Sequence, residues 1–115
     1  GHPEELALYE ALFRAVEEAF PEGSVRVQKT QISFYGRHLF AAASLPVRRK
    51  KGWPEHCLMV TFGLDHREHH SRITVATEPY PNRWTHHVLI SESDQIDPQL
   101  MAMLEEARTF ARSKR

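Results

Sequence analysis

The sequence has little cysteine, little glycine and no long apolar run, and each shortage excludes a class of protein. A single cysteine, Cys57, excludes an internal disulfide and a multi-cysteine zinc site. No apolar run approaches the roughly 18 residues that a membrane-spanning helix needs. Residues 1–5 show no basic region followed by an apolar core. We therefore expect a cytoplasmic protein without a membrane partner.

Recognisable cofactor motifs are also missing. The five glycines form no phosphate-binding loop and no dinucleotide-binding fingerprint, and no pair of catalytic carboxylates stands out. Cys57 opens an apolar stretch, where a small core residue is a better interpretation than a nucleophile. We expect no cofactor, and a binding domain is favoured over an enzyme.

What is present predicts a single α+β domain over residues 1–115. At 115 residues, with 41% hydrophobic and 26% charged residues, the chain suits one two-layer core and is too short for two. Apolar residues recur every three or four positions over residues 4–20, which predicts a helix that buries Leu6, Tyr9, Phe13, Val16 and Phe20 and leaves its glutamates outside. A second helix begins at Asp97, a good N-cap, followed by Pro98 at the first helical position.

Between the helices, short alternating runs separated by turn residues predict strands joined by hairpins. The expected strands cover residues 24–28, 31–35, 38–47, 57–65, 83–91 and a short or extended segment at 73–76. We expect a mostly antiparallel sheet of about five strands, with both terminal helices on one face and the other face at least partly open. Alanines 41–43 leave room for a helix to pack closely.

The strand at residues 83–91 carries the most distinctive pattern. Alternation puts Trp84 and His86 on one face and His87 on the other. We predict that Trp84 is largely buried against Leu104 or Phe13. His86 should then be buried, neutral and hydrogen-bonded, while His87 reaches the open face.

Several motifs together resemble a family of small bacterial domains of unknown function. They are Lys29-Thr30-Gln31-Ile32, the spacing from Phe34 to Phe40-Ala41 with an arginine between, Arg83-Trp84-Thr85-His86-His87, and the closing helix that begins with an acidic residue and proline. The resemblance covers nearly the whole chain and implies a small α+β fold, but it supplies no mechanism. Histidines 66, 69 and 70 depart from the family pattern.

Charge is unevenly distributed although the net charge is zero. Residues 1–22 hold six glutamates and one arginine, whereas residues 23–53 hold seven basic residues and no acidic one. Such a stretch is typical of a basic sheet rim that attracts anions, or simply of solvated strand edges. We predict that the rim binds a nucleic-acid backbone, phosphate or an acidic partner through Lys29, Gln31, Arg37, Arg83 and His87, with Tyr35 and Trp53 available for stacking.

Two other functions stay open. The open sheet face could serve as a protein-interaction or homodimer surface. Alternatively, histidines 66, 69, 70, 86 and 87 could form a zinc or nickel site, or a histidine could act as an acid or base with Asp65 or Glu68. The helical spacing of known histidine metal motifs is absent, so our predicted site includes no metal.

Overall fold

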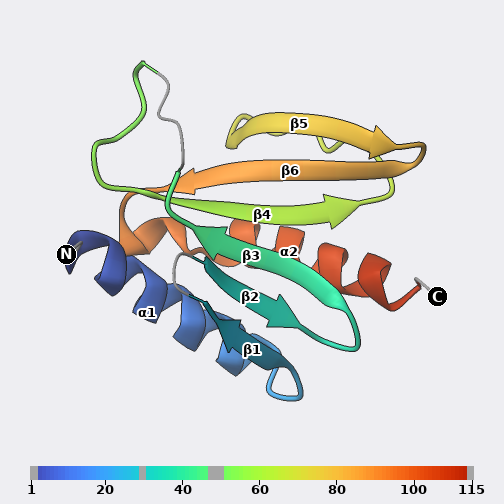
Figure 1. Ribbon diagram of the computed structural model, residues 1–115, viewed down its shortest axis with the longest axis horizontal. Helices are drawn as coiled ribbons and strands as arrows, with labels where there is room; N and C mark the ends of the chain where they lie inside the picture. The colour runs from blue at the N-terminus through green and yellow to red at the C-terminus, as the bar shows by residue number, and fades with distance from the viewer. Residues whose placement is uncertain (1–2, 29–30, 47–50, 114–115) are drawn as a thin grey trace.

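The computed structural model describes residues 3–28, 31–46 and 51–113, which form an antiparallel sheet and two long helices (Figure 1). The strand order is β1-β2-β3-β4-β6-β5, and every neighbouring pair is antiparallel. The α+β prediction is confirmed, but the sheet has six strands and not about five. The elements are α1 (Pro3–Ala19), β1 (Ser24–Val27), β2 (Gln31–Tyr35), β3 (Leu39–Ser44), β4 (Leu58–Leu64), β5 (Ile73–Tyr80), β6 (Arg83–Ile90), a 3-10 turn η1 (Ser93–Gln95) and α2 (Pro98–Arg112).

The strand count differs because β5 is twice as long as the segment predicted at 73–76. It continues through Pro79 to Tyr80, which pairs with Arg83 across a tight turn. Proline is tolerated there because β5 is an edge strand, so its missing N–H breaks no ladder bond. Asn82 adopts a φ of 62°, a left-handed conformation that asparagine accepts more readily than most residues, and closes the hairpin.

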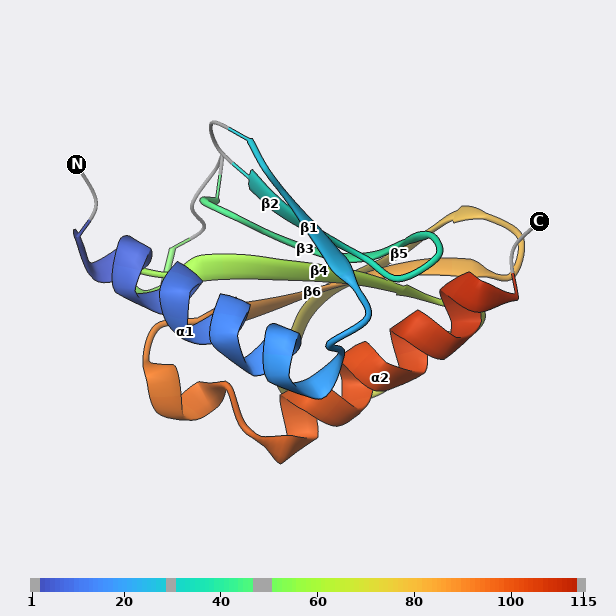
Figure 2. The same cartoon turned by 90° about the horizontal axis from the view of Figure 1, so that it is seen from below.

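Both helices lie on the same face of the sheet, as predicted (Figure 2). On β3, Ala41 and Ala43 are buried, and on α2, Ala107 and Ala111 are buried. Small side chains on facing elements let the helix approach the strand closely, which confirms the expectation drawn from the alanine run. Cys57 is also buried, as expected of a small core residue.

The buried face of α1 differs from the prediction. Leu8, Leu12 and Val16 are buried, whereas Leu6 is 58% exposed. Two apolar stripes overlap in this helix, and the sheet covers the one that contains Leu8. The expectation that the glutamates lie outside is wrong for Glu5, which is 1% exposed and has Oε2 3.2 Å from Nδ1 of His56.

The start of α2 is confirmed. The Asp97 side chain accepts a hydrogen bond of 2.9 Å from the Leu100 N–H, and Pro98 occupies the first helical position. Arg72 donates a 2.8 Å hydrogen bond to the same carboxylate. The Leu100 N–H and the Arg72 guanidinium lower the pKa of Asp97. Among the described residues, neither helix is long and apolar enough to cross a membrane.

Trp84 is only partly buried, so the prediction that it packs deep against Leu104 or Phe13 is wrong. It shares a face with the buried residues of β6, but it is the second residue of that strand and lies near the end of the sheet. The Arg67 guanidinium lies 5.9 Å from the centroid of its ring. The most deeply buried aromatic side chains of the described sheet are instead Phe34 and Phe62, which are 1% and 2% exposed.

Glycine is required at position 23, in the connection between α1 and β1. A Cβ built at this position would lie 2.8 Å from the Tyr35 carbonyl oxygen and 3.2 Å from that of Phe20, and backbone atoms cannot give way cheaply. We expect Gly23→Ala to lower the free energy of unfolding by about 1–3 kcal/mol in urea titrations. Gly36→Ala is the control, because its Cβ would meet only Arg108 at 3.6 Å. Equal stability of the two variants would contradict this close approach.

Candidate functional site

The residues predicted to form one basic rim do not lie on one surface. Lys29 falls outside the described residues. Gln31 is the first residue of β2 and pairs with Ser44, the last residue of β3. Arg37 follows the other end of β2, in the turn that leads into β3. Gln31 and Arg37 are therefore at opposite ends of the sheet, since a strand rises about 3.3 Å per residue.

Arg83 and His87 are likewise separated along β6. Arg83 begins the strand, and its neighbour Trp84 pairs with Leu64 at the end of β4, so Arg83 lies at the same end of the sheet as Arg37. His87 lies mid-strand on the open face, with Nδ1 2.9 Å from the hydroxyl of Thr61. Only Arg37 and Arg83 of the predicted set share an end of the sheet.

A cavity of about 440 Å³ lies at this end and is lined by three arginines. Its walls are the α1–β1 connection, the turn between β2 and β3, and the C-terminal half of α2. We call it the arginine cavity. The described residues that line it are Phe20, Glu22, Gly23, Gly36, Arg37, Arg108 and Arg112.

Arg108 is held in place by its neighbours. Its guanidinium carbon lies 4.8 Å from the centroid of the Phe20 ring, a cation–π arrangement. One terminal nitrogen is 3.4 Å from the Glu105 carboxylate, a long ion pair between residues three apart on the helix. Nε is buried and has no hydrogen-bond partner among the described residues. A buried donor without an acceptor is costly, and an anion in the cavity could satisfy it.

Arg37 and Arg112 complete the positive lining. Within the described part of the chain, neither makes an ion pair or a side-chain hydrogen bond. Glu22 is the one acidic residue among the described residues of the lining, so positive charge exceeds negative charge there. Three arginines line this one space, and guanidinium groups are planar donors suited to phosphate or carboxylate oxygens.

Sequence reasoning missed Arg108 and Arg112 as site residues. Arg112 lies in the last turn of α2, where it also complements the helix dipole. The available signal was their spacing, because residues four apart share one face of a helix. Arg83 lies on another flank of α2, with its guanidinium carbon 5.2 Å from the Phe110 ring centroid, and does not line the cavity.

Comparison with known proteins identifies a family and adds no activity. Residues 2–111 match the family model described as Domain of unknown function (DUF5655). The chain belongs to this family. No curated protein and no solved structure matches the chain. The resemblance to a family of unknown function is thus confirmed, whereas the motifs as markers of DUF5655 and a bacterial origin stay predictions.

In this DUF5655 domain the two adjacent histidines of β6 have separate environments, as predicted. His86 is fully buried, its ring stacks on Phe62 with centroids 5.1 Å apart, and its Nε2 accepts a 2.9 Å hydrogen bond from the Glu68 N–H. The neutral ring therefore carries its proton on Nδ1. Burial lowers the pKa of His86, against opposing effects of the Phe62 backbone and Glu68. Burial also lowers the pKa of His87.

The histidines considered for a metal site do not converge. Among the described residues, no three of these five histidines bring ring nitrogens within 4.8 Å of one another. His86 and His87 point to opposite faces of β6, and His70 accepts a hydrogen bond from the Arg72 N–H. Nδ1 of His66 lies 2.6 Å from Oδ1 of Asp65, and Nε2 of His66 lies 3.3 Å from Oε2 of Glu68. The hydrogen bond to Asp65 raises the pKa of His66. These exposed contacts are ordinary ion pairs.

The buried His86 should make stability depend on pH. Its folded pKa is depressed, so below about pH 6.5 the unfolded chain takes up a proton that the folded ring resists. The contribution of neutral His86 to the free energy of unfolding is therefore fully present above that pH. It is lost as the pH falls below it. In urea titrations, the free energy of unfolding should fall between pH 7.5 and 5.5. His86 should account for up to about 1 kcal/mol of this decrease.

The matched variants for this prediction are His86→Gln and His69→Gln. Glutamine does not titrate, so His86→Gln should remove its part of the pH dependence and leave that of His87. His69→Gln is the control, because it makes the same replacement at an exposed histidine. An unaltered slope in His86→Gln would show that His86 is not the responsible group.

Proposed function

We propose that this domain binds an anionic ligand, through a phosphate or carboxylate group, in the arginine cavity. The observation that carries the proposal is that Arg37, Arg108 and Arg112 line one cavity of about 440 Å³. That volume falls within the range of about 300–1,000 Å³ typical of small-molecule sites. Anion binding is also the function expected from the sequence. The site proposed here lies at one end of the sheet, however, and not along a sheet rim.

Charge inside the cavity supports this proposal. Arg37 and Arg112 form no ion pair with a described carboxylate, and the buried Nε of Arg108 has no hydrogen-bond partner among the described residues. Each charge-assisted hydrogen bond to an anion would contribute about 1.5–3 kcal/mol, since guanidinium and anion are both charged. Two such bonds would suffice for measurable binding of a small anion at low salt.

One of the residues expected to stack with nucleic-acid bases is partly engaged within the domain. Of the two aromatics expected to stack with bases, Tyr35 has the Arg26 guanidinium carbon 5.2 Å from its ring centroid, so one ring face is occupied. The basic loop that sequence reasoning assigned to the rim lies largely outside the described residues, at 47–50. A nucleic-acid partner, an acidic protein and a homodimer therefore stay alternatives that the experiment must separate.

The test is a binding titration at low ionic strength with inorganic phosphate, single-stranded DNA, duplex DNA and RNA as probes. We expect phosphate to bind and Arg37→Gln to weaken it about tenfold or more, because one charge-assisted contact is lost. Arg14→Gln is the control, since Arg14 is exposed on α1 and lines no part of the cavity. Absence of phosphate binding, or equal weakening by both substitutions, would overturn the proposal.

Salt dependence identifies the class of partner. A nucleic-acid binder loses affinity steeply with salt, by about one unit of logarithmic slope for each phosphate contact. Binding of DNA or RNA with a slope of several units that falls on Arg37→Gln would assign a nucleic-acid backbone to the site. Self-association that is insensitive to salt and to Arg37→Gln, without phosphate binding, would favour the protein-interaction alternative.

A further inference from the structure

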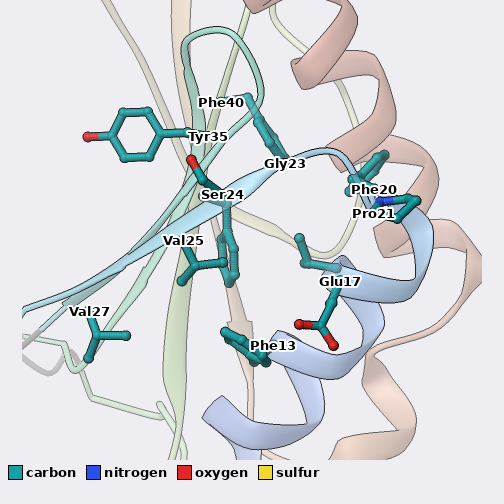
Figure 3. Close-up of a pocket in the computed structure, with 12 residues that line it drawn as sticks. Phe13, Glu17, Phe20, Pro21, Gly23, Ser24, Val25, Val27, Tyr35 and Phe40 are labelled. Carbon is teal, nitrogen blue, oxygen red and sulfur yellow. The ribbon is translucent and has the colours of Figure 1, made fainter.

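An apolar groove adjoins the arginine cavity. It has a volume of about 310 Å³ and lies between α1 and the hairpin of β1 and β2 (Figure 3). Phe13 comes from the helix side, whereas Val25 and Val27 come from β1 on the opposite side. Val27 is 72% exposed, although apolar side chains on an edge strand gain by being covered.

The groove and the arginine cavity share part of their lining. Phe20 and Gly23 belong to both. The Phe20 ring packs edge-on against Phe40, a groove residue, with centroids 5.4 Å apart, and lies under the guanidinium of Arg108. One aromatic ring thus separates an apolar space from a positively charged one, and a ligand that follows this wall would meet both.

We infer that the anion is the head group of a straight-chain amphiphile, with the acidic head at Arg37, Arg108 and Arg112 and the alkyl chain in the apolar groove. This inference rests on the proposed function and specifies its ligand. Charge complementarity places the head, because the arginine cavity is the positive side of the shared wall. The alkyl chain is placed in the apolar groove, because both the chain and the groove gain when their apolar surface is removed from water.

Glu17 is the charged residue of the described groove lining, so an acidic head group placed in the groove would lie near a carboxylate. Glu17 is exposed on α1, so its carboxylate lies where the groove meets solvent. A negative head group there would be repelled, whereas a methyl end would not. The head is therefore expected outside the groove, in the arginine cavity beside Arg108, and the chain along the groove toward Phe13 and Val27.

The experiment measures affinity as a function of chain length. Butanoate, hexanoate, octanoate and decanoate are titrated below their micelle concentrations, with decyl phosphate and uncharged decanol as further probes. Each added methylene that the groove covers should raise the affinity about fourfold, which is about 0.8 kcal/mol converted to a binding constant. Decanol should bind at least tenfold more weakly than decanoate, because it lacks the charge. Comparing decanoate with decyl phosphate identifies the preferred head group.

Matched variants separate the head from the chain. Val27→Glu places a charge in the groove at an exposed position, so the fold should persist, as urea unfolding will check. It should abolish the gain with chain length and leave inorganic phosphate binding intact. Leu6→Glu is the control, because Leu6 is an exposed leucine on α1 outside the groove. Arg37→Gln should weaken all charged probes.

The outcomes distinguish this inference from the proposed function. If inorganic phosphate binds through Arg37 but affinity is independent of chain length, the amphiphile is wrong and the anion site stands. Equal loss of chain-length dependence in Val27→Glu and Leu6→Glu would show non-specific adsorption and also overturn the inference. If neither phosphate nor any amphiphile binds, both proposals fail.

Discussion

Replacing Phe62 by alanine should lower the free energy of unfolding by about 3–5 kcal/mol. Phe62 lies in β4, a central strand, and is 2% exposed. Its ring stacks on the buried imidazole of His86 at an interplanar angle of 13°. Truncation would open a cavity below α2 and leave a buried polar ring without its apolar neighbour, and the surrounding strands cannot move enough to close it.

Urea unfolding monitored by circular dichroism measures this loss, with two variants as references. Trp84→Ala should be less costly than Phe62→Ala, because Trp84 is only partly buried near the end of β6. Leu6→Ala should be close to neutral, since Leu6 is 58% exposed. A loss in Trp84→Ala as large as that in Phe62→Ala would contradict the placement of the core.

The double variant Arg37→Gln with Arg112→Gln should weaken phosphate binding about a hundredfold or more. The two guanidinium groups come from the β2–β3 turn and from α2, and both line the arginine cavity. Each removed charge-assisted hydrogen bond loses about 1.5–3 kcal/mol of binding free energy. The loss should exceed that of either single variant, because each arginine contacts the anion independently.

A matched double variant controls for the overall charge. Arg14→Gln with Arg26→Gln removes the same charge from residues that do not line the cavity. Arg112 also lies in the last turn of α2, so its replacement should cost about 0.3–1 kcal/mol of helix stability, and unfolding must be measured in parallel. Equal weakening of phosphate binding in both double variants would show that general attraction, and not the cavity, accounts for binding.

The features predicted correctly from the sequence depend on neighbouring residues. The start of α2 followed from Asp97 and Pro98, because an N-cap needs only a side-chain acceptor and the next few backbone donors. The opposite environments of His86 and His87 followed from strand alternation alone. Such features need no knowledge of how distant elements pack.

The errors arose where distant elements decide the outcome. Pro79 reads as a turn residue, yet β5 continues through it because the strand lies at the sheet edge, which only the topology reveals. The burial of Leu8 in place of Leu6 depends on how α1 lies on the sheet. The arginine cavity joins Arg37 to Arg108 and Arg112, which are about seventy residues later in the chain. No local sequence pattern indicates that these three arginines line one cavity.

Occupancy of the arginine cavity by an anion can be observed at the Nε–H resonances of the arginines that line it. Arg108 Nε is buried without a hydrogen-bond partner among the described residues, so a bound anion should move its resonance strongly. In a phosphate titration at low salt, we expect saturable shifts of the Nε–H signals of Arg37, Arg108 and Arg112, with Arg14 unchanged. If these three signals stay fixed, or move no more than that of Arg14, the cavity is not an anion site.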